Sequence, residues 1–492
     1  MEIALRKDLF IAGAFCAPAT GEAEPVFNPA TGKVLGEAPV GGLVDLDSAL
    51  AAARDSFDRG VWRALPAAQR VAQMQVFHDH LMERIEEIVA LIIAETGALA
   101  GMARAAQFGV PMKNFRYYLE AARRDFTAMA RPEVSPNPQG MKTLGAAVVV
   151  REPVGVVAAI TAYNYPCMLN LMKVVPALLM GNSVVLKPSP FTPFEALLLG
   201  DAARAAGLPD GVFNVVTGAA AVSQQLTVDP RVDLVSFTGS DAVGAAIAAQ
   251  AAPSLKRIVM ELGGKSAMIV RADANIDQAL AAGYNAIVSH SGQACVALSR
   301  HLVHNSIRDA YVGKLRERVA AVKVGDPNDS TAQMGPLIRD SQRERVERHV
   351  ETALQSGATL VAGGKRPVGL GGGYYYEPTF FNDVDNRSAI AQEEIFGPVG
   401  VVIGFDTDAE ALALANDSRY GLSGAIFSAD AGRAYEMALQ LRTGGVNLNG
   451  GPGTMLSDAP FGGIKRSGYG REMGVDGLLE YTQPKTIGFH AA

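Results

Sequence analysis

The feature that most constrains the fold is the alternation of short β-branched runs with helical stretches that begins near residue 155. Strands are predicted at residues 155–160, 183–186, 213–216, 234–237 and 257–261, with helices at about 167–180, 193–206 and 242–250. A second alternating block, with the strand patterns SAMIV, HLVHN, VGVVIGF and SGAIFS, runs from residue 266 to about 449. The pattern predicts two doubly wound α/β domains built on parallel sheets.

The segments around these blocks carry other patterns. Residues 46–93 have helical periodicity and stop at Gly97, so they are expected to be helical. Residues 131–140, RPEVSPNPQG, lack periodicity and are predicted to be a connector, followed by two strands that break at Pro153. The apolar run at residues 9–17 is preceded by Asp8 and is short, which favours a hairpin over a signal segment.

Charge and cysteine usage exclude several classes of protein. The net charge of -6 leaves no basic surplus, so no nucleic-acid partner is expected. Two asparagines and a proline interrupt the uncharged run at residues 153–172, so a buried strand and helix are expected there rather than a membrane span. Cys16, Cys167 and Cys295 form no CxxC pair, which argues against a disulfide framework or a metal site and favours a reducing cytoplasm.

Three familiar active-site motifs are missing. No GxGxxG follows a strand, and no GxSxG elbow occurs. The GGKS at residues 263–266 is not a P-loop, because Val259 stands where that motif needs its first glycine.

Several residues remain as candidates, each with a plainer alternative. Cys295, in SHSGQACVALSR, is either a small buried hydrophobe or a nucleophile exposed by a tight turn. Gly239 and Ser240, in SFTGSDAVG, open a helix where a pyrophosphate could bind, or form an ordinary strand-to-helix turn. His290 is assigned no chemistry.

The ends of other predicted strands carry polar groups. Asn164, in TAYNYP, could donate to an oxyanion or cap a helix. Lys187 could reach a cofactor ribose or phosphate, or could be a solvated strand end. Glu261 and Glu394 are flanked by apolar residues and glycine, which suggests either a catalytic task or a structural salt bridge.

Taken in order, the motifs NYP, KPSP, FTGS, ELGGKS, GQACVALSR, MGPLI, EEIFGPV and PFGGIKRSGYGRE resemble those of the NAD(P)-dependent aldehyde dehydrogenase superfamily over essentially the whole chain. The resemblance implies a cofactor-binding domain of residues 1–131 and 153–262 and a catalytic domain of residues 263–465. It also implies a small β flap of residues 132–152 and 477–492, which pairs subunits in a homodimer or homotetramer.

The resemblance further implies a role for each matching residue. Cys295 matches the nucleophile, Glu261 the base that activates water, and Asn164 the oxyanion donor, while Lys173 and Glu472 match positions suspected of relaying protons. The residues that match cofactor contacts are Lys187, Gly239, Ser240, Val243, Leu262, Glu394 and Phe396. The residues that match the aldehyde tunnel are Tyr165, Leu169, Met172, Ala294, Val296 and Phe461. No metal ion is implied.

The cofactor and substrate are less constrained. Pro190 stands where many NAD-preferring members place a glutamate, so NAD is expected with some tolerance of NADP. The matching tunnel positions are apolar apart from the Tyr165 hydroxyl and include no Arg or Lys, which favours a hydrophobic or aromatic aldehyde. The glycine-rich loop at residues 449–460 is predicted to be flexible.

Two alternatives remain beside a hydrolytic aldehyde dehydrogenase. An acylating enzyme that passes the acyl group to coenzyme A would lack the base that Glu261 matches. A catalytically idle member of the family, serving as a binding or structural protein, is disfavoured by the presence of Cys295, Glu261 and Asn164 together.

Overall fold

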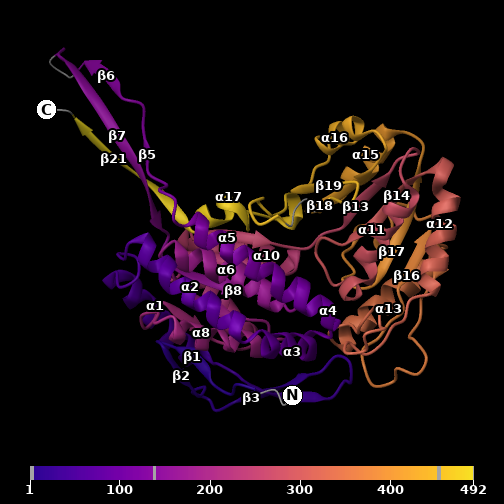
Figure 1. The fold of residues 1–492 in the computed structure, drawn as a ribbon, viewed down its shortest axis with the longest axis horizontal. Helices are drawn as coiled ribbons and strands as arrows, with labels where there is room; N and C mark the ends of the chain where they lie inside the picture. Colours follow the sequence, from indigo (N-terminus) through magenta and orange to yellow (C-terminus); the bar gives the residue numbers. More distant parts are fainter. Residues whose placement is uncertain (1–4, 137–139, 452–455, 491–492) are drawn as a thin grey trace.

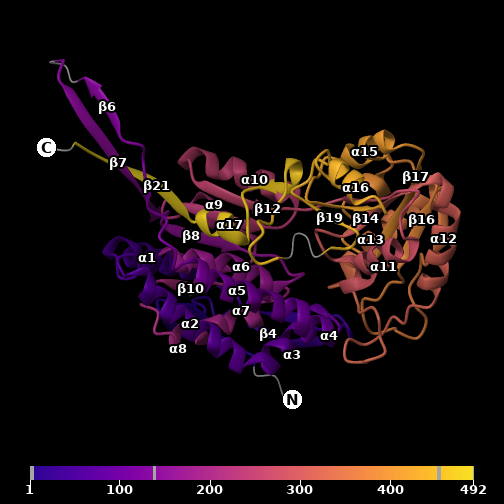
Figure 2. The ribbon, with the colours of Figure 1, turned by 45° about the horizontal axis from the view of Figure 1, so that its top comes forward.

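The computed structural model describes residues 5–136, 140–451 and 456–490. Two α/β units lie side by side, one drawn mainly in indigo and magenta and the other in salmon and orange (Figure 1). A thin arm of strands projects from the first unit, and a second view shows it standing clear of both (Figure 2). The predicted α/β class is therefore confirmed.

The first unit is built on an eight-stranded sheet whose strand order reverses in the middle. Its order is β2 (Ala14–Cys16), β1 (Leu9–Ile11), β10 (Phe213–Val215), β9 (Ser183–Lys187), β8 (Val156–Ile160), β11 (Leu234–Thr238), β12 (Arg257–Glu261) and β20 (Gly468–Tyr469). The strands from β10 to β12 are parallel, and the predicted N-terminal hairpin is β1 and β2. The chain runs outward from β8 to β10 and then crosses to β11. Ligands bind at such a switch point, beyond the carboxyl ends of the strands.

Both faces of this sheet are covered because side chains alternate along each buried strand. On β8, Val157 and Ala159 join one apolar cluster, and Val156 and Ala158 join another. The first cluster includes residues of α2 (Ala67–Glu83), α3 (Ile85–Thr96), α5 (Val110–Ala121), α6 (Pro166–Leu179), α7 (Phe194–Leu197) and α8 (Leu199–Ala205). The second includes residues of α1 (Leu43–Arg59), α9 (Ala220–Val228) and α10 (Asp241–Ala251).

The helical region predicted over residues 46–93 is three helices rather than one. The first ends at Gly60, which adopts a φ of 74°, and the second and third meet at Arg84. Gly97 ends the third helix at a φ of 70°, as the sequence predicted.

The second unit is a seven-stranded sheet. Its order is β15 (Thr359–Ala362), β16 (Thr379–Asn382), β17 (Val399–Phe405), β14 (Leu298–His304), β13 (Ser266–Val270), β18 (Ser423–Phe427) and β19 (Gly445–Leu448). All neighbours are parallel except β15 and β16. Its longer helices are α11 (Ile276–Val288), α12 (Asn305–Ala320), α13 (Asp340–Gln355), α15 (Asp408–Asn416) and α16 (Ala431–Ala438). The predicted second block is thus confirmed.

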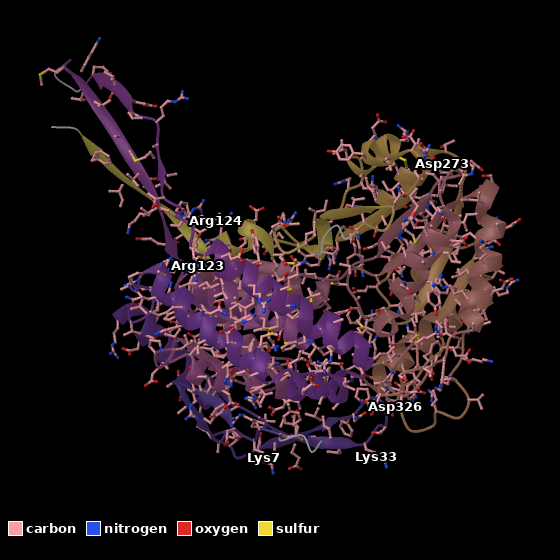
Figure 3. The ribbon with its side chains drawn as sticks, viewed as in Figure 1. Lys7, Lys33, Arg123, Arg124, Asp273 and Asp326 are labelled. Atoms are coloured by element: carbon pink, nitrogen blue, oxygen red, sulfur yellow. The ribbon has the colours of Figure 1, made fainter. Side chains whose placement is uncertain are left out.

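The arm is a separate sheet of β21 (Thr482–His490), β7 (Lys142–Pro153) and β5 (Ala128–Met129), in which β6 (Glu133–Pro136) also pairs with β7. The prediction of a plain connector at residues 131–140 was wrong, because β6 lies there. The antiparallel pairing with β7 satisfies its backbone, and Pro136 stands at its end, where an edge strand tolerates proline. Arg123 and Arg124 lie where the arm leaves the body (Figure 3).

None of the helices in the described ranges is long and apolar enough to cross a lipid bilayer.

The strand β21 begins only at Thr482, because α17 (Gly474–Leu479) occupies the first residues of the segment assigned to the flap.

Candidate active site

A cavity of about 490 Å³ opens between the two units, beyond the carboxyl ends of β8, β11 and β12. The predicted site residues that line it are Asn164, Tyr165, Leu169, Met172, Gly239, Ser240, Glu261, Leu262, Ala294, Cys295, Val296, Glu394, Phe396, Phe461 and Glu472. Lys173, Lys187 and Val243 do not line it. Residues 452–455 of the predicted flexible loop lie outside the described residues.

The turn that presents Cys295 is strained. His290, Ser291 and Gly292 adopt φ values of 48°, 55° and 69°, a left-handed conformation that is unfavourable for the first two. The hydroxyl of Ser291 donates to the carbonyl of Gly335 at 2.7 Å, and Gln293 Oε1 accepts from the Ile338 amide at 3.0 Å. The surrounding segment therefore holds a backbone shape that these residues would not adopt alone.

His290 is buried within this turn. Burial lowers the pKa of its imidazole to about 4, so the ring is neutral at physiological pH. The ring packs edge-on against Tyr165, with 5.3 Å between centroids. His290 therefore supports a wall of the cavity.

The Cys295 thiol is partly exposed to the cavity and starts protonated. Burial raises its pKa, and the negative charges of Glu394 and Glu261 raise it further. Asn164 is buried nearby, and its Nδ2 donates one hydrogen to the carbonyl of Gln293 at 2.9 Å. This bond fixes the amide beside the thiol, and an amide nitrogen has a second hydrogen to offer.

Glu261 ends β12 as an unpartnered acid. Among the described residues, neither of its carboxylate oxygens has a hydrogen-bond partner, and the side chain is only 3% exposed. Burial raises its pKa well above the usual range, and the charge of Glu472 raises it further. A buried carboxyl without a partner is unfavourable for stability, so its retention beside a cavity is typical of a functional group.

A buried ion pair lies directly behind Glu261. Lys173 Nζ donates to Glu472 Oε1 at 2.6 Å and to Ser236 Oγ at 3.3 Å. Lys173 is fully buried, and Glu472 is the member of the pair that reaches the cavity. A structural salt bridge was one alternative for Glu261, but the buried salt bridge here joins Lys173 to Glu472 instead.

The other end of the cavity is shaped for a polar ligand. Ser240 caps α10, and its Oγ accepts from the amide of Val243 at 3.3 Å. Helix N-termini attract anions through their free N–H groups. Glu394 Oε1 accepts from the amide of Gly264 at 2.9 Å, and burial raises the pKa of this carboxyl to about 7.

Two residues at this end were not identified from the sequence. Gln342 Nε2 donates to the carbonyls of Ile395 and Phe396, at 2.9 and 2.8 Å, which holds Phe396 at its left-handed φ of 59°. Arg345 lines the cavity and donates to the carbonyl of Glu394 at 2.6 Å. The sequence predicted no Arg or Lys at the positions that match the aldehyde tunnel. Arg345 is not one of those positions, but its guanidinium does line the cavity as a whole.

Lys187 lies outside the cavity, at the end of β9. It is 6% exposed, burial lowers its pKa to about 8, and within the described residues no hydrogen bond or ion pair reaches its amine. Pro190 lines a second cavity of about 500 Å³ together with Glu24 and Arg339. Val243 is about half exposed on α10.

The remaining walls are mainly apolar and include residues that the sequence did not reveal. Met102, Ala106 and Val110 line the cavity from a stretch that includes the π-helix η1 (Ala103–Gly109). Met168 and Ser289 also line it. The spacing of four residues between Met102, Ala106 and Val110 is typical of one face of a helix. Nothing in the sequence pattern indicates which cavity that face lines.

Comparisons with known proteins identify the family of this chain. Residues 15–487 match the model of the "Aldehyde dehydrogenase family". The betaine aldehyde dehydrogenase of Bacillus subtilis (strain 168) is 36% identical, with 98% of this chain and 97% of the relative covered. The geranial dehydrogenase of Castellaniella defragrans is also 36% identical, with 98% of each covered.

A solved structure shows the same fold. The crystal structure of a Mycobacterium tuberculosis aldehyde dehydrogenase complexed with NAD+ is 40% identical, with a TM-score of 0.92. The alignment covers 99% of this chain and 98% of that one.

Proposed function

The chain belongs to the aldehyde dehydrogenase family, and on that basis we propose that it oxidises apolar aldehydes to carboxylic acids with NAD+ through Cys295. The observation that carries this proposal is the common cavity. It brings a thiol, a fixed amide donor and an unpartnered buried carboxyl together from three separate stretches of the chain.

In the first half of the reaction, the Cys295 thiol releases its proton to solvent in the cavity, and the resulting thiolate attacks the aldehyde carbon. The oxyanion that develops is held by the Asn164 amide and the Cys295 backbone N–H, and such a donor is worth roughly 3 to 4 kcal/mol. The bound nicotinamide supplies the hydride acceptor. A thioester then remains on Cys295.

In the second half, Glu261 removes a proton from water, and the resulting hydroxide attacks the thioester carbon. The C–S bond breaks, the sulfur leaves as the thiolate, and the carboxylic acid is released. We assign the buried Lys173–Glu472 pair the task of taking up and passing on the proton of Glu261, because Glu472 faces the same cavity.

The residues at the far end fit a dinucleotide. The N-terminus of α10 at Ser240 offers free N–H groups to a pyrophosphate, and Glu394 could accept from the nicotinamide ribose. Lys187 lies outside this cavity, and its amine, which has no partner within the described residues, could donate to the adenosine ribose. Gly239, Leu262, Val243 and Phe396 would complete these contacts. NAD+ is bound in the structure of the M. tuberculosis relative, which supports NAD use here.

Tolerance of NADP rests on position 190. Pro190 presents no carboxylate to repel a 2′-phosphate, so we propose that NADP is accepted less well than NAD. The nearby Glu24 carboxylate, in the same cavity as Pro190, supports the preference for NAD.

The substrate is proposed to be hydrophobic or aromatic. Leu169, Met172, Val296 and Phe461 form apolar walls around the thiol. A quaternary ammonium group favours an aromatic cage, but the single tryptophan, Trp62, is buried against α6 and donates to Leu178. The walls therefore favour an aldehyde of the geranial kind over betaine aldehyde.

The arm is proposed to pair subunits into a homodimer or homotetramer. Exposed apolar side chains gather on it, at Met129, Val134, Leu144, Ile487 and Phe489. The strands β21 and β19 each lie at the edge of a sheet, and open edges invite pairing with another chain. The cytoplasmic location rests on cysteine usage alone and stays a prediction.

The decisive experiment is a panel of aliphatic, aromatic and quaternary ammonium aldehydes, each tested with NAD and with NADP, with and without coenzyme A. Reduced cofactor and free acid without coenzyme A are expected, with Cys295→Ser as the inactive control. Turnover only with coenzyme A would favour an acylating enzyme. No turnover, with Cys295 alkylation changing nothing, would favour an idle member of the family.

A further inference from the structure

Two buried glutamates lie behind the candidate site, outside the residues assigned to catalysis. Glu95 ends α3 and is fully buried, and Glu195 lies in α7 and is 2% exposed. Their carboxyl groups interact directly, so the pKa of each depends on the other. Two carboxylates at hydrogen-bonding distance cannot both be ionised in a dry interior, so the pair shares a proton.

The surrounding bonds show which carboxyl holds the proton. Glu95 Oε1 accepts from the amide of Phe194 at 2.8 Å, and its Oε2 accepts from the amide of Glu195 at 3.4 Å. Among the described residues, no amide, hydroxyl or cationic group donates to Glu195 Oε2, which leaves this oxygen to carry the proton that the pair shares. Glu95 is therefore the carboxylate and Glu195 the carboxylic acid.

A chain of side-chain bonds leads from this pair to the loop that carries Asn164. Asn170 Nδ2 donates to Glu195 Oε1 at 2.8 Å, and Thr161 Oγ1 donates to Asn170 Oδ1 at 2.6 Å. Since Glu195 accepts from the amide nitrogen, the amide oxygen must face Thr161. The Thr161–Asn170 bond closes the turn between β8 and α6, and Asn164 lies within that turn.

We propose that Glu195 is a positioning residue for the oxyanion donor: through Asn170 and Thr161 it holds the β8–α6 turn in the shape that aims the Asn164 amide at Cys295. The inference rests on the proposed function. It predicts that the chemical step, rather than cofactor binding, depends on the protonated form of Glu195.

The charged and titratable groups around the Glu95–Glu195 pair do not compensate its charge. Cys167 faces it from α6, and burial raises the pKa of that thiol. Lys173, on the same helix, is paired with Glu472, and Asp201 on α8 is paired with Arg6 and Arg84. Within the described residues, neither glutamate receives a bond from Lys or Arg, so loss of the shared proton leaves two charges without compensation.

The pH dependence of the stability that this pair contributes follows from the raised pKa values of Glu95 and Glu195. Burial raises the pKa of both carboxyls above their usual range, so the folded chain keeps a proton that the unfolded chain gives up. The stability that the pair contributes therefore falls as the pH rises. Repulsion in the alkaline range would pull Glu195 from Asn170 and release the turn.

The test compares wild type with Glu195→Gln, Glu195→Ala, Thr161→Val and the Glu195→Ala/Thr161→Val double variant, with the exposed Glu86→Gln as control on α3. Glutamine can still accept from Asn170 and donate to Glu95, but it cannot titrate. We expect Glu195→Gln to keep kcat at neutral pH and to lose less kcat and less melting temperature than wild type in alkaline buffer.

Glu195→Ala and Thr161→Val should each lower kcat by about tenfold, with the KM for NAD+ unchanged, and the double variant should be no worse than the stronger single one. Thr161→Ser, which keeps the hydroxyl that donates to Asn170, should have the kcat of wild type. Additive effects, an unchanged kcat, or a Glu195→Gln pH profile identical to wild type would overturn the proposal. If Glu195→Ala does not fold, the other variants decide the outcome. If wild type oxidises no aldehyde, the proposed function fails, while the melting curves still test the shared proton.

Discussion

Glu261 is the residue whose environment is most unfavourable for stability and most useful for catalysis. It is buried without a hydrogen-bond partner, and its raised pKa is suited to a base that must take a proton from water and then release it. The neighbouring Lys173–Glu472 pair supplies charges close to it without neutralising it by a direct bond.

We therefore predict that Glu261→Gln separates the two halves of the reaction. Hydride transfer does not need the base, so a burst of reduced cofactor equal to the enzyme concentration should remain, followed by turnover slowed about 10² to 10⁴-fold. Stopped-flow absorbance would measure both phases. Glu351→Gln, which changes an exposed carboxyl on α13, is the control and should behave as wild type. Loss of the burst itself would contradict the assignment.

Glu394 gives a prediction about pH. Because burial raises its pKa to about 7, the carboxylate that could accept from the ribose becomes protonated as the pH falls through neutrality. Affinity for NAD+ should be highest in alkaline buffer and should weaken several-fold between about pH 8.5 and about pH 6. Calorimetric titration would measure this change. Glu394→Gln should bind more weakly with a flatter pH dependence, and an unchanged slope would assign the titration to another group.

At the residue scale, the sequence predicted the groups that we propose to be catalytic, but not the groups that hold them in place. Cys295, Glu261 and Asn164 stand in short motifs whose order was informative. Gln342 and Arg345 lie on a helix surface with many other polar residues, and only the fold turns their side chains to the cavity.

At the scale of elements, local pattern predicted most strands, because each buried strand is a short β-branched run between turns. It missed β6, because the prolines in and around this strand suggested a connector, whereas its edge position tolerates its single proline, Pro136. It also missed the π-helix η1 and the left-handed backbone at His290 and Ser291, since both depend on contacts with distant segments.

The π-helix leads to a prediction about substrate size. Ala106 is the small residue between Met102 and Val110 on the cavity wall, so Ala106→Leu should shorten the space for the tail of the aldehyde. The KM for long-chain aldehydes should rise about tenfold or more, while that for propanal should change little. Ala105→Leu, on the exposed face of the same turn, is the matched control. Equal effects of both variants would show a loss of folding rather than of fit.

At the scale of the whole molecule, the arm is the feature that a monomer does not account for. It stands away from both α/β units (Figure 2). It also bears exposed apolar side chains. Sequence alone could assign this segment only through family resemblance, because a strand that is stabilised by another subunit has no distinctive pattern of its own.

We predict that Ile487→Glu together with Phe489→Glu converts the oligomer to monomers. These side chains are 51% and 47% exposed on β21, and a charge at each would oppose burial against a second chain. Light scattering after size-exclusion chromatography would measure the mass. Leu439→Glu, at a site on the other unit that is 71% exposed, is the control. A double variant that keeps the wild-type mass would rule out the arm as the interface.

The central claim is that oxidation proceeds through an acyl group on Cys295. Its most direct test is mass spectrometry of Glu261→Gln, mixed with NAD+ and an apolar aldehyde and quenched in acid. We expect the peptide that contains Cys295 to gain the mass of one acyl group and to lose this group on treatment with hydroxylamine. The corresponding peptide of Cys295→Ser should gain no acyl group. An unmodified Cys295 peptide despite reduced cofactor, or an acyl group on another residue, would contradict it.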